Sequence, residues 1–108
     1  MGKSRRENDP PLLILTSLAS GPKHGHALLL DIESFAGVRL GPGTLYGAIS
    51  RLEERGLIEG LGQEGRTRPY RLTNEGATAL EAALADLRSI VEEGTKRLLL
   101  TPALGRPR

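Results

Sequence analysis

The chain has 108 residues, with 15 Lys and Arg against 13 Asp and Glu, so its formal net charge is +2. This length fits one domain and excludes a multidomain enzyme. The absence of cysteine excludes a disulfide-stapled module, and no apolar run reaches the roughly 18 residues that span a membrane. The basic start is followed by acidic residues and prolines, which is not typical of a signal peptide. With one Phe, two Tyr and no Trp, the core must be rich in leucine and alanine. We therefore expect a soluble, cytoplasmic and mostly helical protein.

Two helices are predicted first. Prolines 10 and 11 precede an apolar stretch, residues 12–19, which stops at a Ser-Gly-Pro sequence. Proline at the start and Gly-Pro at the end are typical of a short buried helix. A second helix is predicted from Gly25 to a stop at Ala36-Gly37, because apolar residues recur there at steps of three and four. These residues are Ala27, Leu28, Ile32 and Phe35.

The third helix has the clearest signals. Gly41 can serve as its N-cap, Pro42 suits its first position, and it runs to Arg55 with Gly56 as its stop. Its apolar stripe is Leu45, Ala48, Ile49 and Leu52. The opposite face carries Gly43, Thr44, Gly47, Ser50, Arg51 and Glu54. Two glycines cost this helix about 1 kcal/mol each relative to alanine, which indicates that close approach to this face is required.

A β-hairpin is predicted next. Extended segments 57–61 and 68–72 flank a polar, glycine-bounded tip at 62–65. A proline in the outgoing segment confines that strand to an edge or to a position without a ladder hydrogen bond. The outgoing arm carries three arginines, Arg66, Arg68 and Arg71. Arg71, like Arg55 of the third helix, is predicted to be a surface salt-bridge residue.

A long final helix follows Thr73, which can cap it. Its apolar residues keep a heptad spacing, and those predicted to form a dimer interface are Leu80, Leu84, Leu87, Val91, Gly94 and Leu98. Amphipathic helices usually pack on their own domain. However, a helix from 74 to 100 extends about 40 Å, and a monomer this small cannot cover that span. From 74 to 93 the helix carries five acidic residues against Arg88 alone, which would repel DNA.

This order of elements is typical of a winged helix-turn-helix. The predicted fold is mainly α with a two-stranded β wing and a long C-terminal dimerisation helix. We expect a flexible basic arm at 1–10, a DNA-binding domain at 11–73, the dimerisation helix at 74–100 and a disordered tail at 101–108.

This fold is suited to binding duplex DNA. The major groove of DNA admits one helix, whose short polar side chains and arginines can read base edges. Arg66 and Arg68 in the wing can hold DNA, although charges there can also simply protect a strand edge. The first turn of the second helix, with Lys23, His24 and Gly25, can bind the phosphate backbone. The predicted base-reading residues are Gly43, Thr44, Tyr46, Gly47, Ser50 and Arg51. Tyr46 can instead pack beside the buried stripe, and Arg51 can instead pair with a neighbouring glutamate.

Three stretches resemble the PadR-like transcriptional regulators: 24–28 (HGHAL), 41–58 (GPGTLYGAISRLEERGLI) and 65–76 (GRTRPYRLTNEG). The chain departs from the family at His26, where a tyrosine is usual, and at Gly41, where a serine or threonine is usual. The resemblance, over about residues 11–100, implies a homodimeric DNA-binding protein, often a repressor, joined through its terminal helices. It also implies the small subfamily, with one helix after the wing. Some small members bind flat, hydrophobic drugs using a tryptophan of the last helix, and this chain has no tryptophan.

The predicted function is a sequence-specific transcriptional repressor, with double-stranded DNA and a second copy of itself as partners. One alternative is a winged-helix module that binds only protein, whose groove face would be apolar or acidic. Another is a sensor whose interface binds a small hydrophobic effector. His24 and His26 cannot share a helix face, and no carboxylate or cysteine cluster joins them, so neither a metal site nor a cofactor is predicted. No nucleophile arrangement indicates an enzyme.

Overall fold

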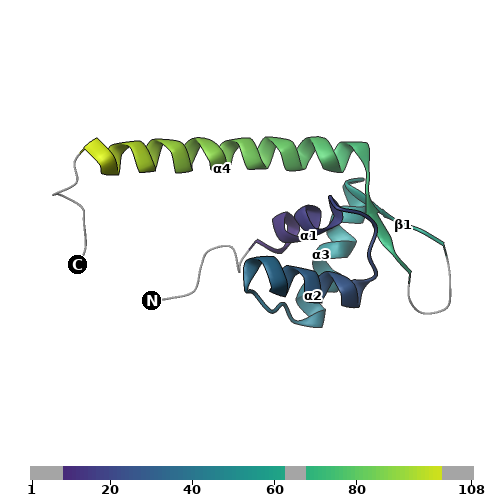
Figure 1. Cartoon of the computed structure of the whole chain (residues 1–108). Coiled ribbons are helices and arrows are strands. Elements are labelled where there is room, and N and C mark those ends of the chain that lie inside the picture. Colours follow the sequence, from purple (N-terminus) through teal and green to yellow (C-terminus); the bar gives the residue numbers. More distant parts are fainter. Residues whose placement is uncertain (1–8, 63–67, 101–108) are drawn as a thin grey trace.

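The computed structural model describes residues 9–62 and 68–100. In chain order, the elements are α1 (Pro10–Leu18), α2 (Gly25–Ala36), α3 (Pro42–Glu54), β1 (Ile58–Gly60), β2 (Tyr70–Leu72) and α4 (Asn74–Leu100). Figure 1 shows α1, α2 and α3 gathered into one body, with the hairpin at one end of it. Helix α4 starts beside the hairpin, passes over α1 and continues beyond the body. The predicted fold, mainly helical with a two-stranded wing, is confirmed.

The helix ends follow from local chemistry. The carboxylate of Asp9 accepts a hydrogen bond from the backbone N–H of Leu12 at 3.3 Å and so caps α1, a cap the sequence analysis did not assign. Gly37 and Gly56 follow α2 and α3 with φ of 69° and 77°, a left-handed conformation that glycine adopts at little cost. These two glycines lie where the sequence predicted helix stops.

The core lies between the three helices of the body, with α1 in contact with α2, α3 and α4. All four residues of the predicted α3 stripe are buried, together with Ile14 of α1 and Ile58 of β1. The apolar face of α2 is narrower than predicted. Leu28 and Ile32 are fully buried, but Ala27 is exposed and Phe35 is 47% exposed. Phe35 lies in the last turn of α2, at the edge of the body, where α1 and α4 only partly cover it.

The wing is the antiparallel pair β1–β2, in which Ile58 lies opposite Leu72 and Gly60 opposite Tyr70. Both strands are shorter than predicted, and Pro69 lies just before β2. The other edge of β2 is also paired, which the sequence analysis did not predict. Lys23 and Tyr70 exchange backbone hydrogen bonds of 3.1 and 2.9 Å, so the segment before α2 joins the sheet.

Helix α4 begins tight against the body. The hydroxyl of Thr73 accepts a hydrogen bond from Gly76 N–H at 3.0 Å and donates one to the carbonyl of Gly56 at 2.7 Å. Gly76 is buried so closely that an added methyl would overlap the carbonyl oxygen of Leu57. Among the residues described, no helix has both the length and the apolar character needed to cross a membrane.

Candidate nucleic-acid interface

The solvent-facing side of α3 carries all six predicted base-reading residues. Gly43, Thr44, Tyr46, Ser50 and Arg51 are exposed, and Gly47 is half-buried. An added methyl at Gly43 would meet no atom within 4 Å, and one at Gly47 would meet only Arg51 Nη1, at 3.6 Å. The N-terminal half of this face therefore presents backbone with little side chain in front of it. Such a surface lets another molecule approach the helix closely.

Arg51 is available for an external partner. Neither Arg51 nor Arg55 forms an ion pair with any other described residue. The expectation of a surface ion pair at Arg55 is therefore not met within the described chain. Glu53, a predicted alternative partner of Arg51, is bonded to Arg68 instead.

Tyr46 combines the two alternatives left open by the sequence. Its side chain is 47% exposed, yet its ring lies over the start of α2. An added methyl at Gly25 would overlap the Tyr46 hydroxyl and lie 2.7 Å from Cζ. Gly25 is accordingly buried, whereas its neighbour His24 is exposed. Tyr46 thus packs α3 onto α2 and leaves about half of its side chain in solvent.

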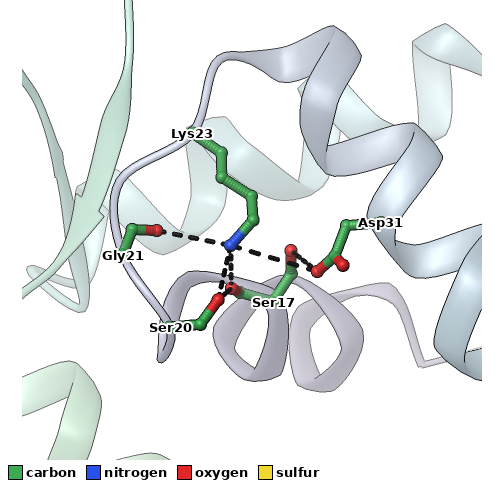
Figure 2. Close-up of polar contacts among 5 residues, drawn as sticks. All are labelled: Ser17, Ser20, Gly21, Lys23 and Asp31. Carbon is green, nitrogen blue, oxygen red and sulfur yellow. Dashed lines mark hydrogen bonds and ion pairs between the residues drawn. The ribbon is translucent and has the colours of Figure 1, made fainter.

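Lys23 lies where the sequence did not place it (Figure 2). Its ammonium donates hydrogen bonds to the carbonyl of Ser17 at 2.5 Å and to the hydroxyl of Ser20 at 2.8 Å. It also lies 4.0 Å from an Asp31 carboxylate oxygen, which accepts a 2.6 Å hydrogen bond from the buried Ser17 hydroxyl. The side chain is only 18% exposed.

The Lys23 ammonium therefore caps the C-terminal end of α1 and faces the protein, not the solvent where DNA was expected. The negative end of a helix attracts cations, so a lysine a few residues after the end of a predicted helix is a sequence signal for such a cap.

Two wing arginines are bonded within the protein. Arg68 Nη2 donates to Glu53 Oε2 of α3 at 2.9 Å. Arg71 forms an ion pair with its cross-strand neighbour Glu59, with Nε 2.6 Å from Oε2, as predicted for a surface salt bridge. The remaining predicted wing contact, Arg66, lies outside the described residues. Within the described ranges no three His, Cys, Asp or Glu side chains gather in a way that could hold a metal ion.

The predicted interface of α4 needs one correction. Leu80 is 6% exposed and belongs to the core of its own chain, because the first turns of α4 lie on the body. Beyond it, the stripe is open to solvent: Leu87 is 37% exposed, Val91 62% and Leu98 54%, and nothing lies within 4 Å of an added methyl at Gly94. We call Leu84, Leu87, Val91, Gly94 and Leu98 the pairing stripe.

An apolar pocket of about 360 Å³ adjoins the pairing stripe, between α1, α2 and α4. Its lining residues are Leu12, Leu13, Thr16, Phe35, Ala36, Leu84 and Leu87. The pocket explains why Phe35 is only partly covered within one chain.

The model of the transcriptional regulator PadR-like family matches residues 14–82. The chain belongs to this family. It is 30% identical to a PadR family transcriptional regulator from Eggerthella lenta DSM 2243, with a TM-score of 0.67 over 89% of this chain and 86% of that chain. A PadR family transcription regulator from Clostridium difficile R20291 is 28% identical, with a TM-score of 0.70 over 82% of this chain and 97% of that chain.

A protein described as an uncharacterized 37.1 kDa protein in transposon TN4556 of Streptomyces fradiae is 50% identical over 76 residues. The match covers 70% of this chain but only 22% of that protein.

Proposed function

We propose that this PadR-like regulator binds DNA sequence-specifically as a homodimer and acts as a transcriptional repressor in the cytoplasm. The observation that carries the proposal is the exposed face of α3, which combines two glycines with small polar residues and an arginine that has no ion-pair partner among the described residues. The major groove admits a helix of this kind, and arginine binds guanine edges through two hydrogen bonds.

Individual roles follow from position. Thr44, Ser50 and Arg51 read base edges, while Gly43 and Gly47 permit the close approach. Tyr46 contributes the exposed part of its side chain. His24, at the exposed start of α2, and Arg66 of the wing bind phosphates. The winged helix at 11–73 thus holds the DNA contacts, and the helix at 74–100 holds the dimer contacts.

The dimer is proposed from the pairing stripe. An apolar surface along a helix that leaves its own body is typical of an interface. Val91 lies at the middle of the stripe, seven residues from both Leu84 and Leu98. We propose antiparallel pairing of two α4 helices about a two-fold axis near Val91. Leu98 of one protomer then covers Leu84 of its partner, beside the pocket that holds Phe35. Two recognition helices related by such an axis suit a near-palindromic operator with half-sites about one helical turn apart.

A small hydrophobic effector is proposed for the apolar pocket, whose volume falls within the range of ligand sites. Because Leu84 and Leu87 belong to both the pocket and the pairing stripe, a bound molecule would change how the protomers pair. The test is titration of operator complexes with the hydrophobic dye ANS. Release of DNA at dye concentrations that saturate the pocket supports the effector, and unchanged affinity contradicts it.

Selection of bound sequences from a random duplex pool tests the main proposal. A two-fold-symmetric consensus supports both dimerisation and base reading. The alternative, a winged helix that binds only protein, predicts no enrichment and no salt-dependent binding to random duplex DNA. Binding to random duplex without a consensus would retain the DNA contact and contradict the base-reading roles of Thr44, Ser50 and Arg51.

A further inference from the structure

The guanidinium of Arg68 is held on three sides, between the wing and the recognition helix α3. Nη2 is 2.9 Å from Glu53 Oε2 of α3, and Cζ lies 5.6 Å from the centre of the Tyr70 ring. On the third side is Gly60 of β1, where an added Cβ would lie 2.5 Å from Nε and 2.7 Å from Nη2. The Arg68 side chain is 34% exposed.

The residue at position 60 is a glycine because of this position of the Arg68 guanidinium, not because of its own backbone conformation. The glycines with positive φ in the described chain are Gly21, Gly37, Gly56 and Gly62, so the backbone at Gly60 does not itself require glycine. What a side chain at this position would displace is the guanidinium of Arg68. The missing side chain therefore makes room for Arg68.

The contacts with Glu53 and the Tyr70 ring require an arginine at position 68. A planar guanidinium can hydrogen-bond a carboxylate in its plane and stack on a tyrosine with its face at the same time, whereas an ammonium is a point charge without a face. The wing also depends on contacts with the rest of the protein for its stability. Its strands are three residues each, and a two-stranded hairpin is marginally stable on its own.

We propose that Arg68 is a positioning residue that sets the wing against α3, and that it does not contact phosphate. The ion pair with Glu53 fixes the angle between the recognition helix and β2, and so fixes where the wing tip meets DNA. This inference rests on the proposed DNA-binding function.

Three variants separate positioning from phosphate contact. Gly60→Ala displaces the guanidinium without changing any charge. Glu53→Gln removes the partner and also one negative charge beside DNA, which by electrostatics alone would tighten binding. Arg68→Lys keeps the charge and loses the planar contact. Positioning predicts that all three weaken operator binding about tenfold while the dependence of random-DNA binding on salt stays that of the wild type.

The controls are Glu59→Gln and Arg71→Lys, which alter the other wing ion pair without touching α3. Both should bind the operator like the wild type. The inference is overturned if Glu53→Gln tightens binding, or if Gly60→Ala and Arg68→Lys both bind as the wild type does. Melting temperatures of all variants verify that they fold.

Amide hydrogen exchange at Leu61 and Tyr70 gives a readout that does not depend on DNA. Leu61 N–H donates to the Pro69 carbonyl at 2.8 Å and Tyr70 N–H to the Lys23 carbonyl at 2.9 Å, so these bonds report how firmly the wing is held. Faster exchange in the Gly60 and Glu53 variants supports positioning, and wild-type exchange contradicts it. A wild-type protein that binds no duplex at all would instead refute the proposed function.

Discussion

Val91 lies at the centre of the pairing stripe, and Val91→Asp is expected to convert the dimer into monomers. The side chain is 62% exposed in one chain. Full burial of a valine is worth about 1.5–3 kcal/mol, so covering the exposed part contributes roughly 1–2 kcal/mol per protomer. Because Val91 of each protomer is covered in a two-fold interface, the two valines together contribute about 2–4 kcal/mol to the free energy of dimerisation. Losing this amount raises the dissociation constant roughly 30- to 700-fold, before the cost of burying a carboxylate is added.

Sedimentation velocity over a range of concentrations measures the change. Ser89→Asp is the matched control, because Ser89 is exposed on α4 and points away from the pairing stripe. It introduces the same charge two residues away and should remain dimeric. Circular dichroism should retain the helical signal of the body, since Val91 lies outside the buried core. A Val91→Asp protein that stays dimeric, or a Ser89→Asp protein that dissociates equally, would refute the antiparallel stripe as the interface.

Three further outcomes are expected. Arg51→Ala should weaken operator binding about 5- to 150-fold while random-duplex binding falls less, and unchanged operator selectivity in competition assays would exclude a base-reading role. Gly76→Ala should lower the free energy of unfolding in urea by about 1–3 kcal/mol, because its methyl meets the Leu57 backbone, whereas Gly43→Ala, in open space on the exposed face of α3, should not lower it. The chain has no cysteine. Mixed Leu84→Cys and Leu98→Cys protomers should therefore form a disulfide on oxidation, and a disulfide in either variant alone would indicate parallel pairing.

Local sequence signals predicted most of the fold because they act within a few residues. The spacing of Leu45, Ile49 and Leu52 places one face of α3 in the core wherever the helix packs. Likewise, a Pro at the start and a Gly after the end define helix bounds without tertiary information. The exposed face of α3 follows directly, as the complement of the buried stripe.

The amphipathic pattern of α4 shows the limit of this reasoning. Leu80 and Val91 lie on the same apolar stripe of α4, yet the first is buried in its own chain and the second is exposed. The pattern identifies an apolar face but not which molecule covers it. That depends on how far the body extends along α4, which is set by the packing of α1 and the wing.

The sequence also does not tell which basic side chains face DNA and which pair with carboxylates of the protein. From composition alone, each lysine and arginine near the recognition helix is a candidate phosphate ligand. The structure gives carboxylate partners to Lys23, Arg39, Arg68 and Arg71. These pairs join residues that lie 6 to 15 positions apart in the sequence, so no local spacing rule identifies the carboxylate partner. A partner brought by tertiary packing therefore decides whether a basic residue faces DNA or the protein.

This distribution of ion pairs bears on how the protein can discriminate between DNA sequences. Around the body, Arg51 and Arg55 are the described basic residues without an ion-pair partner, and both belong to α3 or its C-cap. Sequence-independent binding to DNA strengthens with the number of phosphates that lysines and arginines contact. Basic residues that are already paired with carboxylates add little to such binding. Among the described residues of the body, the unpaired positive charge thus lies close to Gly47 and Ser50, on the face proposed to meet base edges. In the proposed complex, pairing the other described cations of the body within the protein lowers the affinity for random DNA more than the affinity for an operator, and so favours specificity.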